Sequence, residues 1–131
     1  LHSFLMNSLD GFPHIKNSVN LSIVAWVNIN KQGDYNLKHV HPTSDLSGVV
    51  WIKCSENCGN IEFDNPSVFQ TYKELVSYTD DFKDRSNIHE SYYFTPTEGR
   101  IIVFPSYLLH KVEVNKSDED RISVSFNIVL N

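Results

Sequence analysis

Short runs rich in β-branched and aromatic residues, some of them alternating with polar residues, predict short β-strands from residue 21 onward. The β-branched and aromatic stretch LSIVAWVNIN (21–30) predicts the first strand, and a turn built on Gly33 and Asp34 follows it. Further strands are predicted from YNLKHVH (35–41), LSGVVWIKC (46–54), GNIEFDNP (59–66), HESYYFTP (89–96), GRIIVFPS (99–106), LHKVEVN (109–115) and RISVSFNIVL (121–130). About eight short strands favour a mainly β fold.

Two stretches predict peripheral helices. Residues 1–17 place apolar side chains at roughly helical spacing before a glycine and a proline, and residues 66–82 carry a second apolar stripe. The stripe consists of Phe69, Tyr72, Leu75 and Val76. A polar link is expected to follow through Arg85 and Asn87. Together the patterns predict one domain over residues 1–131, folded as a double-layered β-barrel or jelly roll with one or two peripheral helices.

Composition and charge exclude several classes of protein. With 40% hydrophobic residues the chain is typical of globular proteins, and its formal net charge of -5, without a cluster of Lys and Arg, argues against a nucleic-acid partner. No apolar run approaches the roughly 18 residues of a spanning helix, and the start lacks the order of a signal peptide. We therefore expect a cytoplasmic protein with no membrane partner. The first residue is Leu1, which leaves open whether an N-terminal segment is missing.

The two cysteines form no recognisable motif. Cys54 and Cys58 are separated neither as in the CxxC redox motif nor as in half of a zinc site, and no second cysteine pair would complete a tetrahedron. We expect two reduced thiols near a turn, because disulfides are rare in intracellular proteins. Their role is left open.

The histidines are the first candidates for chemistry. Residues two apart on a strand project to the same side, so His39 and His41 are expected to share a face with Tyr35 and Leu37. Two such imidazoles suit adjacent corners of a metal coordination sphere, and a third ligand must then come from a distant strand. His110 supplies it if its strand lies beside the first. The alternative is that the three are incidental polar residues; His2, His14 and His89 are expected to be surface residues.

An arginine follows the last of these histidines. Arg121 opens the stretch RISVSFN, in which it shares a face with Ser123, Ser125 and Asn127. A guanidinium beside a metal ion suits a dicarboxylate co-substrate, because it holds one carboxylate in a bidentate pair while the metal takes the other end.

The order of HVH, LSGVVWI, NIEFDNP, GRIIVFPSYLLH and RISVSFN resembles the Fe(II)- and 2-oxoglutarate-dependent oxygenases of the double-stranded β-helix class. It looks most like a small, prolyl-hydroxylase-like branch common in marine bacteria and their phages. The resemblance covers roughly Trp26 to Asn127, and its most specific part is the pattern G-R-I-I-V-F-P-S-x-x-x-H with the later R-I-S.

The resemblance implies a role for each candidate. His39 would be the first iron ligand of an H-x-D/E motif and His110 the distal one, while Arg121 would hold the far carboxylate of 2-oxoglutarate with Ser123 assisting. From its expected face alone, Tyr35 would either line the same pocket or belong to the barrel core. The class places Asp or Glu where this chain has His41. Either His41 itself binds, giving three imidazoles, or Asp45 folds back; we favour His41, because Asp45 lies four residues on, beyond Pro42.

The implied activity is hydroxylation of a substrate with O2 and 2-oxoglutarate, releasing succinate and CO2. The substrate would be a peptidyl residue or a small metabolite, which the sequence does not identify, and it does not indicate the oligomeric state. Two alternatives stay open: a cupin-like metal-binding β-barrel, and an inactive interaction module in which His41 marks lost activity. Arg121 separates the first of these from the oxygenase, because a cupin needs no dicarboxylate clamp there.

Overall fold

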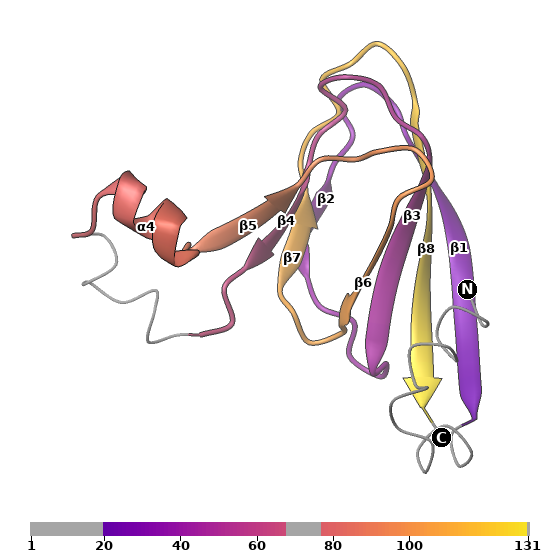
Figure 1. Cartoon of the computed structure of the whole chain (residues 1–131). Coiled ribbons are helices and arrows are strands. Elements are labelled where there is room, and N and C mark those ends of the chain that lie inside the picture. The colour runs from indigo at the N-terminus through magenta and orange to yellow at the C-terminus, as the bar shows by residue number, and fades with distance from the viewer. Residues whose placement is uncertain (1–19, 68–76, 131) are drawn as a thin grey trace.

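The structure, a computed structural model, describes residues 20–67 and 77–130. In these ranges the chain forms two four-stranded antiparallel sheets, a first sheet with the order β1-β8-β3-β6 and a second with the order β2-β7-β4-β5 (Figure 1). The elements are β1 (Leu21–Asn30), β2 (Asn36–His39), β3 (Leu46–Lys53), β4 (Ile61–Asp64), α4 (Asp80–Ser86), β5 (Ser91–Phe94), β6 (Ile101–Pro105), β7 (His110–Val112) and β8 (Arg121–Leu130). The prediction of a mainly β jelly roll is confirmed.

The first sheet is built around its longest strands. β1 and β8 pair antiparallel over their whole length, from Leu21 opposite Leu130 to Asn30 opposite Arg121. β3 pairs with the other edge of β8, so that β8 lies inside the sheet. The β-branched and aromatic residues of 21–30 and the period-two alternation of 121–130 predict a strand in each stretch, and both predicted strands match the structure.

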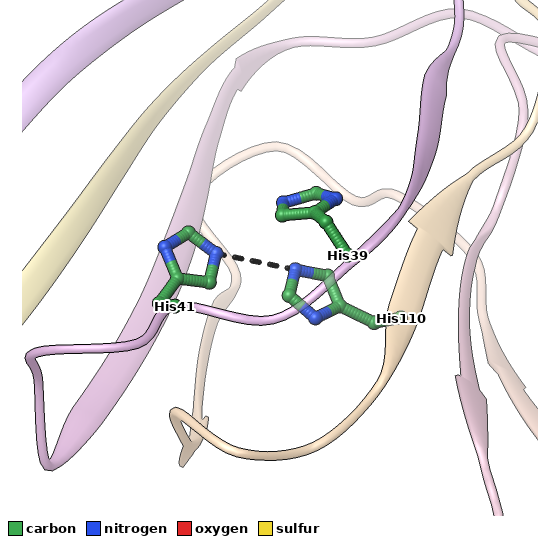
Figure 2. Close-up of side chains that lie close together, drawn as sticks. All are labelled: His39, His41 and His110. Atoms are coloured by element: carbon green, nitrogen blue, oxygen red, sulfur yellow. Dashed lines mark hydrogen bonds between the residues drawn. The ribbon is translucent and has the colours of Figure 1, made fainter.

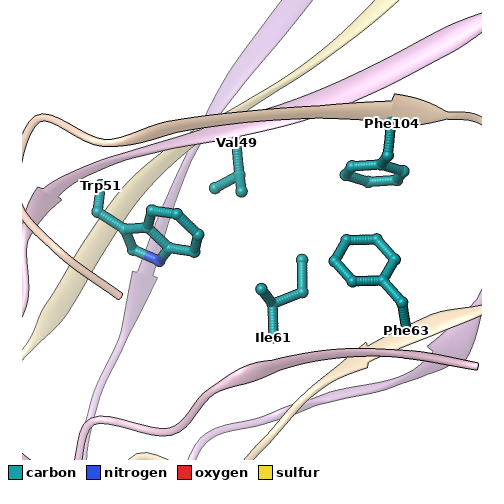
Figure 3. Close-up of a cluster of buried hydrophobic side chains, with 5 residues drawn as sticks. All are labelled: Val49, Trp51, Ile61, Phe63 and Phe104. Atoms are coloured by element: carbon teal, nitrogen blue, oxygen red, sulfur yellow. The ribbon is translucent and has the colours of Figure 1, made fainter. Parts of the chain in front are cut away.

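The main core lies between the two sheets. Val49, Trp51 and Phe104 from the first sheet meet Ile61 and Phe63 from the second (Figure 3). The rings of Phe63 and Phe104 pack edge to face with their centroids 4.7 Å apart. Each buried side chain of this size contributes about 1.5–3 kcal/mol of transfer free energy, so this cluster stabilises the packing of one sheet on the other.

Position 48 in β3 has no room for a side chain, because the ring of Phe126 fills the space. Gly48 lies opposite Phe126 of β8, and an added Cβ would lie 2.5 Å from Cε2 of Phe126 and 2.6 Å from the carbonyl oxygen of Ile102. We expect Gly48→Ala to lower the free energy of unfolding by about 1–3 kcal/mol, because overpacking a well-packed site costs that much. Urea unfolding checks this, with Ile52→Ala, on an exposed position of the same strand, as the control. Equal stability of Gly48→Ala and wild type would contradict the prediction.

The helix differs from the sequence-based prediction. α4 begins within the stretch 66–82 that the sequence predicts to be helical and continues to Ser86, so the predicted link through Arg85 is wrong there. Local signals explain the helix: the Thr79 hydroxyl accepts a hydrogen bond from the Phe82 N–H, and Asn87 ends the helix in the left-handed conformation with φ of 50°. The predicted helix over 1–17 and the apolar stripe after residue 67 lie outside the described residues. Within the described part no helix is both long and apolar enough to cross a bilayer.

Candidate metal centre

Three histidines lie together where the second sheet faces the first (Figure 2). His39 ends β2 and lies opposite His110, which begins β7, while His41 follows β2 by two residues. One ring nitrogen from each lies within 4.8 Å of the others, and in the described ranges no other group of three or more His, Cys, Asp or Glu side chains lies so close. The structure thus brings together the three histidines that the sequence singled out.

Two of the rings are oriented by backbone carbonyl groups. Nδ1 of His39 lies 2.6 Å from the Leu37 carbonyl oxygen, and Nδ1 of His110 lies 2.9 Å from that of Leu108. A carbonyl oxygen only accepts, so each Nδ1 carries the proton and each Nε2 keeps its lone pair for a metal ion. This is the tautomer that a metal-binding imidazole needs.

The spacing of the third ring also suits a metal ion. Nε2 of His41 lies 3.4 Å from Nε2 of His110, and the two rings are nearly parallel. Two ligands about 2.1 Å from one ion and at right angles lie about 3 Å apart. The pair is therefore close to the separation of neighbouring ligands.

Burial lowers the pKa of two of the three histidines. His110 is 3% exposed and packs against Phe63 and Phe104. This burial lowers the pKa of His110 to about 4. Burial also lowers the pKa of His41, and the neighbouring His39 adds to that shift. Because only neutral imidazole binds a metal ion, both shifts favour binding at weakly acidic pH.

The low pKa of His110 predicts an acid-sensitive fold in the protein without metal. In the unfolded chain an imidazole has its ordinary pKa of 6.5, so between pH 6.5 and pH 4 the unfolded state binds the proton that the folded state excludes. Acidification over this range should lower the free energy of unfolding by up to about 3 kcal/mol. Urea unfolding in the presence of a chelator measures it. The pH dependence should shrink in His110→Gln, which does not titrate, and an unchanged pH dependence there would contradict the assignment.

A bulge in β2 decides which residues reach the cluster. The pairing with β7 shifts register between Asn36 and His39, so both of these side chains line the histidine cavity. Tyr35 does not line it. The Tyr35 side chain is 55% exposed and borders a separate hollow beside Leu37 and Lys111. The expected shared face of Tyr35 and His39 is wrong, because strict alternation assumes a strand without a bulge.

Asp45 is engaged elsewhere. Its carboxylate oxygen Oδ2 accepts a hydrogen bond from the Leu130 N–H at 2.8 Å, and its backbone N–H donates to the Ile128 carbonyl at 2.9 Å. Asp45 is therefore fixed at the end of β8 and is not part of the histidine group. The third member of that group is His41.

The cavity between the histidines and β8 also contains the predicted arginine. Arg121 is 1% exposed and Ser123 is 6% exposed, and both line the cavity with the three histidines. The Arg121 Nη1 atom donates to backbone carbonyl groups, whereas Nη2 is buried without a hydrogen-bond partner. Burial lowers the pKa of Arg121, but a guanidinium stays charged in proteins. The cavity thus contains a cation with a free donor.

Sequence reasoning missed part of the wall. Trp26 and Asn28 of β1 line the cavity, as does Asn36, and the Asn28 side-chain amide donates to the Ser125 hydroxyl at 2.8 Å. Trp26 and Asn28 are two residues apart and lie opposite Ser125 and Ser123 of β8, which line the cavity. Their place in the wall follows from the pairing register of β1 and β8, which the sequence of β1 alone does not give.

The cysteines are separate from the metal centre. Both are free thiols, Cys54 being partly exposed and Cys58 buried. They line an open hollow together with other residues of the loop that precedes β4 and with Glu98 and Lys116. Burial raises the pKa of Cys54, so its thiol is less reactive than that of a free cysteine.

Comparison with known proteins adds a family and a fold. A family model described as "Putative 2OG-Fe(II) oxygenase" matches residues 24–127. No curated protein matches the chain. Among solved structures, an oxidoreductase of the 2OG-Fe(II) oxygenase family from Burkholderia pseudomallei is similar with a TM-score of 0.64 and 13% identity; the alignment covers 97% of this chain and 57% of that one.

Two further solved structures share the fold. A prolyl-4-hydroxylase from Pseudomonas putida is similar with a TM-score of 0.62 and 11% identity, over 96% of this chain and 61% of that one. HygX from Streptomyces hygroscopicus, solved with iron bound, is similar with a TM-score of 0.56 and 10% identity, over 98% of this chain and 66% of that one. The chain thus spans about three fifths of the length of the first two structures.

Proposed function

The chain belongs to the 2OG-Fe(II) oxygenase family, and from that premise we propose that it hydroxylates a peptidyl residue or a small metabolite with O2 and 2-oxoglutarate. The observation that carries the proposal is one cavity bordered by three imidazoles and by a buried guanidinium with an unpartnered Nη2. Family membership implies Fe(II) and 2-oxoglutarate as cofactor and co-substrate. The overall reaction would convert a C–H bond, O2 and 2-oxoglutarate into C–OH, succinate and CO2.

The donor set fits Fe(II). Imidazole nitrogen is a good ligand for iron, and two imidazoles of this group have their Nε2 lone pairs turned away from their backbone partners. We assign His39, His41 and His110 as the metal ligands. When bound, Fe(II) would supply the activation of O2. Three neutral ligands leave the ion its full double charge, which favours binding of a dianion.

The arginine fits 2-oxoglutarate. A buried cation without a carboxylate partner is costly, and the carboxylate of a co-substrate would supply that partner. We assign Arg121 to the carboxylate far from the metal ion, with the Ser123 hydroxyl as a second donor. The chain's own residues would thus bind and orient the co-substrate, while Trp51 and Phe104, both buried in the cavity wall, exclude water from it. A cupin without this chemistry would not need Arg121.

The remaining parts of the proposal concern the whole protein. We infer one oxygenase domain over residues 1–131 that acts in the cytosol, where thiols such as Cys54 and Cys58 stay reduced. The narrower likeness to the marine bacterial and phage branch stays a prediction.

Binding of both cofactors can be observed directly. The protein mixed anaerobically with Fe(II) and 2-oxoglutarate should develop the weak visible absorption band of a chelated 2-oxo acid, because the metal ion and the Arg121 guanidinium together hold the co-substrate. Succinate release in air, measured against a panel of peptides and amino acids, then identifies the substrate class. Fe(II) with succinate in place of 2-oxoglutarate is the control without a 2-oxo group. No band at millimolar 2-oxoglutarate would favour the binding-module alternative.

A further inference from the structure

The guanidinium of Arg121 is held from one side by backbone carbonyl groups. Nη1 donates to the Cys58 carbonyl, to that of Glu113 at 3.2 Å and to that of Gly59 at 3.4 Å. These three carbonyls, from the loop before β4 and the link after β7, form what we call the carbonyl cage. In the described ranges Arg121 forms no ion pair with Asp or Glu. The neutral carbonyl groups orient the guanidinium without neutralising its charge, so the charge can still attract a ligand carboxylate.

The cage is rigidly assembled. The Asn60 N–H donates to the Glu113 carboxylate at 3.0 Å, and the Glu113 N–H donates to the Asn60 carbonyl at 2.9 Å. The Lys116 N–H donates to the Asn57 carbonyl at 2.9 Å. The loop and the link are thus joined by bonds independent of Arg121. The carbonyls do not depend on the guanidinium for their positions, so they can determine where it lies.

Gly59 is the residue that allows the cage to close. Its φ of +88° lies in the region that disfavours side chains, and an added Cβ would lie 2.8 Å from the Val114 carbonyl oxygen and closer still to that of Glu113. Any side chain here must push the loop away from Glu113, and the carbonyls of Cys58 and Gly59 would move with it. The closeness of the cage to Arg121 therefore depends on the absence of a Cβ at this position.

We infer that Gly59 is a positioning residue: it lets the carbonyl cage close around Arg121 and fix its guanidinium. The fixed Nη2 then binds the far carboxylate only of a 2-oxo dicarboxylate of one chain length. This rests on the proposed function, because the second carboxylate anchor is the metal ion. With the histidines at one end and an immobile guanidinium at the other, a 2-oxo acid with one methylene more or fewer places its far carboxylate badly. A mobile guanidinium would follow either acid.

The cage is tested first without any ligand. Side-chain 15N NMR of the wild-type protein should show slow rotation of the Arg121 guanidinium with separate Nη signals, because three acceptors hold one edge. Exposed Arg100, whose guanidinium donates to the Thr95 carbonyl alone among its described contacts, should show a fast, averaged signal in the same sample and serves as the internal control. An averaged Arg121 signal in the wild type would overturn the inference, whatever the variants do.

Ligand selectivity is tested on Co(II)-loaded protein by calorimetry with 2-oxoglutarate, oxaloacetate and 2-oxoadipate. The wild type should prefer 2-oxoglutarate by about 10-fold or more, the discrimination that one methylene allows. Gly59→Ala should weaken 2-oxoglutarate binding by about 10-fold and reduce the preference to about 3-fold or less, with Co(II) affinity unchanged. Gly99→Ala is the matched control: its φ is +76° and nothing lies within 4 Å of an added Cβ. Unchanged selectivity in folded Gly59→Ala would overturn the inference.

The two proposals fail in different ways. If none of the three acids binds to wild-type protein that does bind Co(II), the proposed function fails, and the role of Gly59 in selecting a dicarboxylate fails with it. If 2-oxoglutarate binds but Arg121 rotates freely, the proposed function stands and the cage is wrong. If Gly59→Ala does not fold, the NMR measurement on the wild type decides the cage alone.

Discussion

His110→Ala should abolish measurable metal binding, with at least about a 100-fold loss of Co(II) or Fe(II) affinity. Loss of a partner outside the coordination shell already costs about 10–100-fold in metal proteins, and His110 is itself a proposed ligand. It is also the most buried of the three histidines and the one whose ring packs between Phe63 and Phe104. The two remaining imidazoles belong to one short segment and cannot surround an ion.

The measurement is titration with Co(II), followed by its visible absorption bands. Two controls should keep wild-type affinity within about twofold, since neither residue belongs to the histidine group. His89→Ala removes an imidazole that contacts Tyr92, and Asp45→Asn removes a carboxylate bonded to the Leu130 N–H. Circular dichroism should show that His110→Ala is folded. Full Co(II) affinity in the folded variant, or its loss in Asp45→Asn, would overturn the ligand assignment.

Arg121→Ala should weaken 2-oxoglutarate binding by at least about 100-fold while leaving Co(II) affinity nearly unchanged. Loss of a buried, hydrogen-bonded charge partner costs about 2–5 kcal/mol, and Arg121, which lines this cavity, has a buried Nη2 without a hydrogen-bond partner. The substitution also leaves the three cage carbonyls without their donor, which should lower the free energy of unfolding by about 1–3 kcal/mol. Calorimetry with 2-oxoglutarate on Co(II)-loaded protein measures the binding effect, and urea unfolding measures the stability.

Two further variants show whether 2-oxoglutarate binding depends on the charge of Arg121 or on the shape of its guanidinium. Arg100→Ala removes an exposed guanidinium that bonds only to the Thr95 carbonyl among its described contacts, and it should bind 2-oxoglutarate as the wild type does. Arg121→Lys keeps the charge but lacks the fork that can serve the cage and the ligand together, so its affinity should fall between those of the wild type and Arg121→Ala. Wild-type 2-oxoglutarate affinity in folded Arg121→Ala would show that the dicarboxylate binds elsewhere.

The fold class, the strand positions and the family could be inferred without coordinates. Residue type and alternation are local properties of the chain, so stretches such as 21–30 and 121–130 predicted their strands correctly. The resemblance to 2-oxoglutarate oxygenases is confirmed by the family match. Local signals also had limits: residues 83–86 continue α4, which Thr79 caps, where the sequence predicts a link.

The sequence by itself determined which side chains are candidates for metal and co-substrate binding, since it shows two histidines two residues apart and a later histidine and arginine. Only the tertiary structure decided which of them meet. With the bulge in β2, Asn36 lines the histidine cavity and Tyr35 does not, and the loop before β4 brings the Cys58 carbonyl to Arg121. Bulges, strand register and loop contacts depend on partners far along the chain, and alternation within one strand contains no information about those partners.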